Sequence, residues 1–198
     1  MKMRIILIII LFVCCSANFD DVEWFNDFTE IRGSLINGNS LRIKDALPKH
    51  LLNFDYKNIE WEKRVGKNDH GKVWFNREEC KECAEPIEEW LMENKEFFNL
   101  IVPHRNITRV RLALTKYSEG DYLELHNDYG KRVLSFVLHL NKMKPTCGGD
   151  FIWAGGRGIK KARPSENVLY MFIPSTSTWH MIEKVHCGNR YAISGWFY

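Results

Sequence analysis

The sequence predicts a mainly β domain with flanking helices, in which the strands form a jelly-roll-like barrel. After residue 103 the apolar residues recur with a period of two, in short β-rich runs separated by turn signals. No helical pattern interrupts these runs, an arrangement typical of a sandwich or barrel. The 198 residues, 45% of them hydrophobic and 13% aromatic, suffice for one folded domain with a core.

The first 17 residues have the pattern of a signal peptide. Lys2 and Arg4 precede an apolar run at residues 5–13, and Cys15 and Ala17 occupy the −3 and −1 positions of a cleavage site. We expect the mature protein to begin near residue 18. The alternative is an uncleaved anchor, but the apolar run is short for a span of roughly 20 residues.

Cleavage would place the protein in the secretory pathway, in the ER lumen or outside the cell. It would remove Lys2 and Arg4 from 28 basic residues and leave the 25 acidic ones, so the net charge would fall to about +1. This balance argues against a nucleic-acid partner and against a polybasic membrane surface. No stable membrane span is expected once residues 1–17 are removed.

Four cysteines remain in the predicted mature chain: Cys80, Cys83, Cys147 and Cys187. An even number in an oxidising compartment permits two disulfides, whose pairing the sequence leaves open. The C-x-x-C spacing is also compatible with a redox-active pair or half of a zinc site, although no second close pair completes four ligands. Asn106 begins an N-x-T sequon, and its glycosylation stays open.

The segment at residues 18–104 is predicted to be a supporting layer of helices and strands. A short strand is expected at residues 41–47, a helical turn at 48–54 and a second strand at 72–75. A helix is expected within residues 78–98, with Pro86 breaking or starting it.

The segment at residues 105–198 is predicted to be the barrel, forming one compact domain with the preceding segment. The expected strands lie at residues 109–117, 133–140, 151–153, 168–173 and 190–197. Glycine-rich turn signals, such as Gly148-Gly149, separate them.

Two histidines and an aspartate have the composition of a metal site. His126 and Asp128 lie two positions apart, so within a strand both point to one face. His180, on a later strand-like stretch, is the preferred third ligand. His186 ranks below it because it lies in a hydrophilic turn. Two imidazoles and one carboxylate form the facial triad of non-haem Fe(II), which leaves coordination sites open for substrates.

Arg190 and Ser194 are four positions apart in an alternating strand and therefore share a face. A guanidinium inside a barrel is costly unless it receives a carboxylate, and a ligand carboxylate would serve. The alternative is a structural ion pair to an acid such as Glu124.

The ordered motifs resemble the Fe(II)- and 2-oxoglutarate-dependent dioxygenases of the prolyl 4-hydroxylase superfamily. They are Tyr117-x-x-Gly120-x-Tyr122-x-x-x-His126-x-Asp128, Leu140-Asn141, Gly148-Gly149, His180 and the run from Arg190 to Phe197. The resemblance covers residues 105–198 well and residues 41–98 loosely. It implies a double-stranded β-helix in which His126, Asp128 and His180 are the catalytic iron ligands.

The resemblance also implies the residues that bind the cosubstrate, 2-oxoglutarate. Arg190 would pair with its distal carboxylate, Ser194 would add a hydrogen bond, and Tyr117 stands where relatives contact it. His139 stands where relatives have Tyr or Thr, and strand alternation turns it inward. Collagen-type prolyl 4-hydroxylases usually carry Lys in place of Arg190, which makes a collagen-like substrate less favoured.

The function implied is hydroxylation of an unactivated C–H bond with O₂, with release of succinate and CO₂ and with ascorbate as a further cofactor. The expected substrate is a prolyl residue of a secreted or ER-lumenal protein or peptide. Lysyl or small-molecule hydroxylation is an alternative within the superfamily. Outside it, the alternatives are a non-catalytic secreted jelly-roll binding module and a cupin-like metalloprotein.

Overall fold

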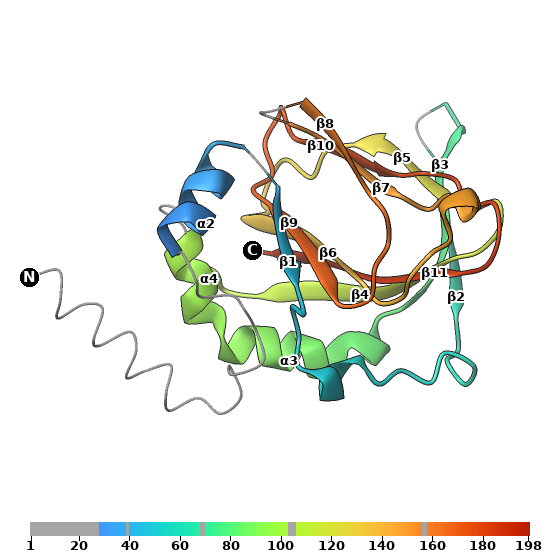
Figure 1. Cartoon of the computed structure of the whole chain (residues 1–198), viewed down its shortest axis with the longest axis horizontal. Helices are drawn as coiled ribbons and strands as arrows, with labels where there is room; N and C mark the ends of the chain where they lie inside the picture. The colour runs from blue at the N-terminus through green and yellow to red at the C-terminus, as the bar shows by residue number, and fades with distance from the viewer. Residues whose placement is uncertain (1–27, 39, 68–69, 103–105, 156–157) are drawn as a thin grey trace, which may run out of the picture.

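A computed structural model describes residues 28–38, 40–67, 70–102, 106–155 and 158–198 (Figure 1). The predicted signal peptide lies outside these residues. Within them, no helix is both long and apolar enough to cross a membrane. The helices are α2 (Phe28–Ile36), α3 (Glu85–Glu93) and α4 (Lys95–Ile101), with 3₁₀ turns η2 (Lys49–Leu52), η3 (Glu82–Ala84) and η4 (Pro145–Cys147). The strands are β1 (Leu41–Lys44), β2 (Glu62–Lys67), β3 (Val73–Cys80), β4 (Val110–Tyr117), β5 (Tyr122–His126), β6 (Leu134–His139), β7 (Phe151–Gly155), β8 (Gly158–Ala162), β9 (Val168–Phe172), β10 (Trp179–Ile182) and β11 (Arg190–Phe197).

The strands form one curled antiparallel sheet. Their order is β1-β9-β6-β11-β4-β3-β5-β10-β7-β8, with β2 paired to β3 outside this path. Strand β3 turns the corner of the sheet, because its Cys80 end pairs with β4 and its Phe75 end pairs with β5. The predicted double-stranded β-helix with flanking helices is confirmed (Figure 1).

Strand alternation divides the apolar residues into two cores. The outer faces of β4, β6, β9 and β11 pack against α2, α3 and α4, with Leu114, Phe136 and Phe197 among the residues buried there. The inner faces form a second core inside the barrel, which contains Tyr117 and Ala192. Helices α3 and α4 lie along the outside of the sheet, near β4 (Figure 1). Burying a polar side chain in this inner core costs free energy unless the side chain is hydrogen-bonded.

The helix predicted over residues 78–98 is wrong at its start. Residues 78–80 end β3, and Cys80 pairs with Leu114 on β4. The helical part is divided into α3 and α4 at Asn94, and Pro86 lies in the first turn of α3, where its missing N–H costs nothing.

Strands β2 and β8 escaped prediction because both are largely exposed and lack an apolar face. Their backbones are held by β3 and β7, so their pairing depends on neighbouring strands and not on a local pattern.

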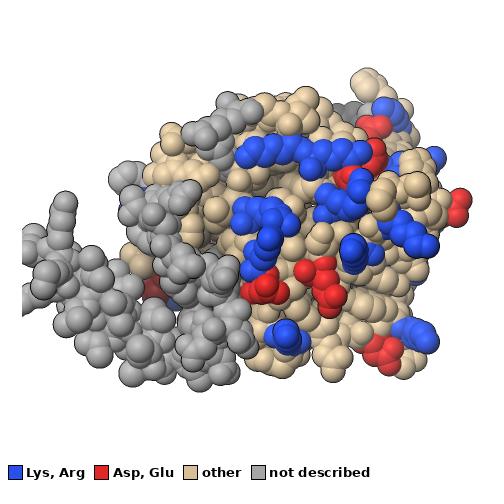
Figure 2. All heavy atoms as spheres, in the orientation of Figure 1, with Lys and Arg blue, Asp and Glu red and all other residues tan. Residues whose placement is uncertain are grey.

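Strand β8 and the segment after it lie on a face rich in Lys and Arg (Figure 2). Acidic side chains oppose part of this charge: Lys161 Nζ lies 3.0 Å from Glu183 Oε1, and Arg163 Nε lies 3.5 Å from Asp150 Oδ1. The expectation of no nucleic-acid partner stays a prediction.

The four described cysteines form two disulfides, Cys80–Cys83 and Cys147–Cys187. The first makes a zinc site at the C-x-x-C pair incompatible with this structure. The second joins the turn before β7 to the turn before β11. There, Gly148 pairs with Val185, and the side chain of Arg190 packs beside Gly149, close enough to leave little room for a Cβ. The Cys147–Cys187 bond therefore holds the segment from which Arg190 projects.

Replacing Cys147 and Cys187 together with Ala should lower the free energy of unfolding by about 4 kcal/mol, because their bond spans 40 positions and removes loop-closure entropy from the unfolded chain. The same change at Cys80 and Cys83, separated by 3 positions, should cost about 2 kcal/mol by the same relation. Urea unfolding of both variants under oxidising conditions measures the two losses in free energy of unfolding. An equal loss, or a larger loss for the Cys80 and Cys83 variant, would contradict this prediction.

Candidate active site

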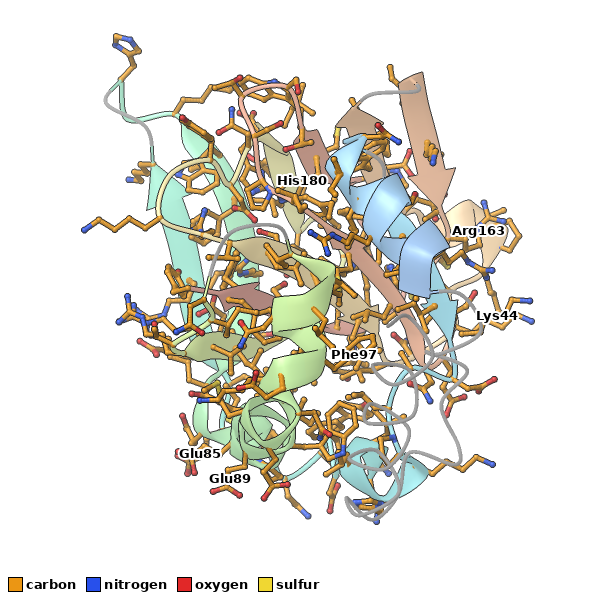
Figure 3. The ribbon with its side chains drawn as sticks, turned by 90° about the vertical axis from the view of Figure 1, so that its left-hand side faces the viewer. Lys44, Glu85, Glu89, Phe97, Arg163 and His180 are labelled. Atoms are coloured by element: carbon orange, nitrogen blue, oxygen red, sulfur yellow. A yellow bond between two sulfur atoms is a disulfide. The ribbon has the colours of Figure 1, made fainter. Side chains whose placement is uncertain are left out.

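The three predicted metal ligands meet inside the barrel. His126 is the last residue of β5, and its register partner on β10 is His180. Asp128 lies two residues beyond β5, so the prediction that both residues of the His-x-Asp pair lie in one strand is wrong, although their side chains still converge. Figure 3 shows His180 among the strands, above the helices that carry Glu85, Glu89 and Phe97.

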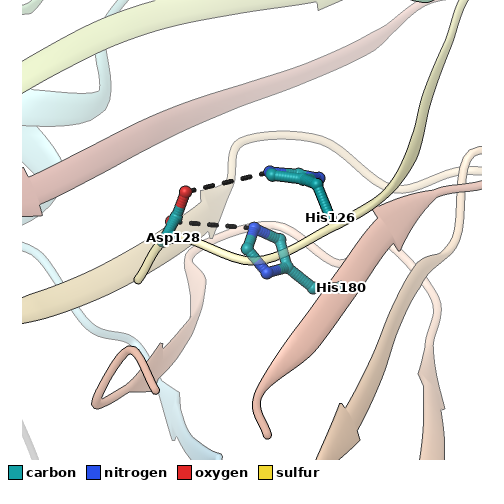
Figure 4. A group of neighbouring side chains, drawn as sticks. All are labelled: His126, Asp128 and His180. Atoms are coloured by element: carbon teal, nitrogen blue, oxygen red, sulfur yellow. Dashed lines mark ion pairs between the residues drawn. The ribbon is translucent and has the colours of Figure 1, made fainter. Parts of the chain in front are cut away.

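The ligand atoms of this group are spaced for a single cation. All three lie within 4.8 Å of one another. His126 Nε2 lies 3.8 Å from Asp128 Oδ1, and His180 Nε2 lies 3.7 Å from Asp128 Oδ2 (Figure 4). Two imidazole nitrogens and a carboxylate facing one point match the donor set of non-haem Fe(II).

Both histidines are held in the neutral form that metal binding requires. Burial lowers the pKa of His126, and burial together with His126 lowers the pKa of His180. His126 Nδ1 lies 2.9 Å from the Glu124 carbonyl oxygen, which can only accept, so Nδ1 carries the hydrogen. Nε2 is therefore left with its lone pair toward Asp128.

The Asp128 carboxylate is oriented by two donors. Trp196 Nε1 donates to Oδ2 at 2.7 Å, and Arg132 Nη1 donates to Oδ1 at 2.7 Å. Burial alone would raise the pKa of Asp128, but His180, Arg132 and Trp196 favour the carboxylate, and the net direction is downward. Such outer partners fix a ligand's orientation before the metal arrives.

A cavity of about 260 Å³ opens beside this group. Ser194, Arg77, Trp74 and Trp196 contribute to its wall together with all three predicted ligands. Tyr117, His139 and Arg190 are buried but are not among the residues that line the cavity, so of the predicted cosubstrate residues Ser194 alone belongs to its wall.

Arg190 is a buried cation with unused donors. Its side chain belongs to the inner face of β11, only 1% of the residue is exposed, and its Nε and Nη2 have no hydrogen-bond partner among the described residues. Burial lowers the pKa of Arg190 to about 10. The alternative pairing with Glu124 is wrong, since Glu124 pairs with Lys72 at 2.8 Å. Unpaired buried donors of this kind fit an anionic ligand.

Tyr117 and His139 lie near the Arg190 guanidinium. The Arg190 Cζ lies 5.2 Å from the centroid of the Tyr117 ring. His139 is fully buried, and no residue in the described part of the chain forms a hydrogen bond with either of its ring nitrogens. Burial and then Arg190 lower its pKa well below the usual value. A neutral imidazole beside an arginine adds a hydrogen-bonding group without adding charge.

Three other side chains, one histidine and two tryptophans, differ in whether they belong to the site. His186 is exposed and lies outside the metal group, as its hydrophilic turn indicated. Trp196 lines the cavity, whereas Trp179 is 40% exposed and does not.

Sequence reasoning missed Arg77 and Arg132, which both line the cavity. Arg132 lies four positions after Asp128. Outside a helix, this spacing does not predict that the two side chains touch. Arg77 was missed because the expected strand ended at residue 75 and the expected helix began at residue 78, so Arg77 belonged to neither. Recognised as a strand, β3 alternates so that Phe75, Arg77 and Glu79 share a face.

A family model described as the 2OG-Fe(II) oxygenase superfamily matches residues 112–198. This segment carries the three predicted iron ligands and all four predicted cosubstrate residues: Tyr117, His139, Arg190 and Ser194. A search of curated proteins finds no match to this chain.

Solved structures with the same fold include several prolyl hydroxylases. A prolyl-4-hydroxylase from Pseudomonas putida is 17% identical, with a TM-score of 0.64, over 86% of this chain and 98% of its own. A prolyl hydroxylase from Trichoplax adhaerens, in complex with a hypoxia inducible factor oxygen degradation domain peptide fragment, is 16% identical, with a TM-score of 0.67, over 86% and 88%. A viral collagen prolyl hydroxylase from Paramecium Bursaria Chlorella virus-1 is 15% identical, with a TM-score of 0.52, over 80% and 94%.

Replacing Arg190 with Met should leave the ligand-free protein as stable as the parent or stabilise it, by up to about 4 kcal/mol, because the change removes a buried charge that forms no ion pair with any described acid and keeps an apolar stem. Arg111→Met, on the exposed side of β4, serves as the control and should change stability by less than about 0.5 kcal/mol. Urea unfolding without metal or cosubstrate measures both; strong destabilisation by Arg190→Met would show a structural role.

Proposed function

We propose that this chain, whose residues 112–198 match the model of the 2OG-Fe(II) oxygenase superfamily, is a dioxygenase of that superfamily that hydroxylates a prolyl residue of a protein or peptide in the secretory pathway. The reaction would consume O₂ and 2-oxoglutarate and release succinate and CO₂. One observation carries the proposal: a two-histidine, one-carboxylate group shares a barrel with a buried arginine that has unused donors.

His126, Asp128 and His180 would hold the iron. Bound Fe(II) would supply the activation of O₂ that couples decarboxylation of 2-oxoglutarate to C–H hydroxylation. The protein's part is to keep both imidazoles neutral, to orient the carboxylate through Trp196 and Arg132, and to shield the reacting atoms from water.

Arg190 would receive the distal carboxylate of 2-oxoglutarate. Its two unpartnered nitrogens offer hydrogen bonds that no described residue accepts, and Ser194, four positions along the same strand face, adds a hydroxyl at the cavity wall. Tyr117 and His139 would complete the cosubstrate site around this guanidinium. Fixing both ends of 2-oxoglutarate would set its orientation to the metal.

A prolyl substrate is supported by the resemblance in sequence motifs and by the prolyl hydroxylases that share the fold. The Trichoplax adhaerens enzyme holds a peptide fragment, which makes a peptidyl substrate a reasonable choice here. Arg190, where collagen-type enzymes usually carry Lys, favours a substrate other than collagen.

The secretory location is supported by the signal-peptide pattern of residues 1–17 and by the two disulfides, which persist in oxidising compartments. Ascorbate, which the family resemblance implies, would keep the iron reduced.

Replacing Asp128 with Ala should abolish turnover and weaken Fe(II) binding, because it removes the only carboxylate ligand of the group. Anaerobic calorimetric titration with Fe(II) measures the binding, and circular dichroism checks that the fold persists. Asp150→Ala is the control, since Asp150 is equally buried in the barrel region but lies outside the metal group. Full activity of Asp128→Ala would contradict the assignment.

Replacing Arg190 with Met should weaken 2-oxoglutarate binding by about 2 to 5 kcal/mol, the cost of removing one partner of a buried charge pair, while Fe(II) affinity changes much less. Titration of the Mn(II)-loaded protein with 2-oxoglutarate measures this, with Arg111→Met as the control. Unchanged 2-oxoglutarate affinity would favour a cupin-like metalloprotein or a non-catalytic barrel.

Residues 1–17 should be absent from protein recovered from the secretory pathway, because they have signal-peptide architecture. N-terminal sequencing decides this, and an intact Met1 would support the anchor alternative.

A further inference from the structure

Arg77 places a second guanidinium at the candidate active site. It lies on β3, and it contributes to the wall of the cavity that contains the three predicted metal ligands. Its side chain is 11% exposed. The metal and cosubstrate roles proposed above do not involve Arg77, so they do not account for its burial at the cavity.

Glu79 and Phe75 hold the Arg77 guanidinium in place. Arg77 Nε donates to Glu79 Oε1 at 2.7 Å, and Nη2 donates to the same oxygen. The guanidinium also lies over the Phe75 ring, with its Cζ 5.0 Å from the ring centroid. Burial lowers the pKa of Arg77, but Tyr117 and Glu79 outweigh it, and the net direction is upward. The group is therefore charged, neutralised by a buried acid and fixed in orientation.

The third nitrogen of this guanidinium, Nη1, forms a hydrogen bond with the Tyr117 hydroxyl. Arg77 Nη1 donates to Tyr117 Oη at 3.1 Å, across 40 positions of sequence. A guanidinium has donors only, so the phenol oxygen must accept. The hydroxyl hydrogen then has to point elsewhere, and the described part of the chain supplies no acceptor for it. Since the Tyr117 ring also lies beside Arg190, a free donor is held next to the proposed cosubstrate arginine.

We infer that Arg77 is a positioning residue, which holds the Tyr117 hydroxyl as a hydrogen-bond donor to a carboxylate of 2-oxoglutarate. Glu79 neutralises Arg77, so the effect comes from orientation and not from added positive charge. This inference rests on the proposed function, because it needs 2-oxoglutarate as the ligand of the cavity. It makes β3 part of the cosubstrate site, whereas the residues predicted from sequence all follow residue 105.

A double-mutant cycle in the full chain tests the inference, with the affinity for 2-oxoglutarate measured by calorimetry on Mn(II)-loaded protein. Arg77→Gln and Tyr117→Phe should each weaken binding by roughly 10- to 100-fold, the size expected when a hydrogen bond to a charged group is lost. The double variant should bind no more weakly than Tyr117→Phe alone, because Arg77 acts through the hydroxyl. Multiplying effects, or parental affinity in Arg77→Gln, would overturn the inference.

Two further variants separate orientation from charge. Arg77→Lys keeps the charge but loses the planar fork, so it should weaken binding like Arg77→Gln; parental affinity in this variant would overturn the orientation argument. It also replaces Arg77→Gln in the cycle if the latter does not fold. Arg64→Gln is the matched control, because Arg64 Nε lies 3.8 Å from Glu79 Oε2 but Arg64 is not part of the cavity wall; its affinity should not change.

The same measurements distinguish failure of the inference from failure of the proposed function. If the parent protein binds Mn(II) and 2-oxoglutarate while Arg77 variants match it, only the role of Arg77 is wrong. If the parent protein does not bind 2-oxoglutarate, both are wrong.

Discussion

The pairing of β11 with β4 on one side and β6 on the other is the constraint on which the site depends. Pairing with β4 runs the whole length of β11, from the Arg190–Tyr117 pair to the Phe197–Val110 pair, and pairing with β6 begins at Ala192, so each residue of the strand has a determined face. Ile193 and Phe197 are assigned to the core under the helices, and Ala192 to the core inside the barrel. Arg190 and Ser194 follow Ala192 inward. A shift of one residue would exchange the two faces and place the arginine in the helix-packed core.

The barrel interior buries polar groups that the described residues leave without hydrogen-bond partners. Arg77 has Glu79 as its acid partner, but within the described ranges two nitrogens of Arg190 and both ring nitrogens of His139 have no hydrogen-bond partner. A protein selected for stability alone would pair or replace such groups. Their persistence in one barrel, next to a two-histidine, one-carboxylate group, is what a bound dianion and a metal ion together would explain.

Strand β3 connects the two segments distinguished in the sequence. Residues 18–104 read as a supporting layer, yet β3 pairs with both β4 and β5 and brings Trp74, Phe75 and Arg77 to the cavity wall. The disulfide Cys80–Cys83 closes the end of this strand, and Cys147–Cys187 holds the turn that precedes Arg190. The site is thus supported from both segments of the chain.

The sequence by itself determined the fold class and the two-residue alternation of the barrel strands, and it predicted His126, Asp128, His180 and Arg190 as site residues, because local periodicity and residue type carry this information. It placed Asp128 in a strand and residues 78–80 in a helix, where local pattern was ambiguous. Only the tertiary structure decided the disulfide pairs, the position of β3 and the contact between Arg77 and Tyr117, 40 positions apart. Such contacts depend on which strands become neighbours when the sheet curls, and strand order follows from the packing of the whole sheet, which no local pattern encodes.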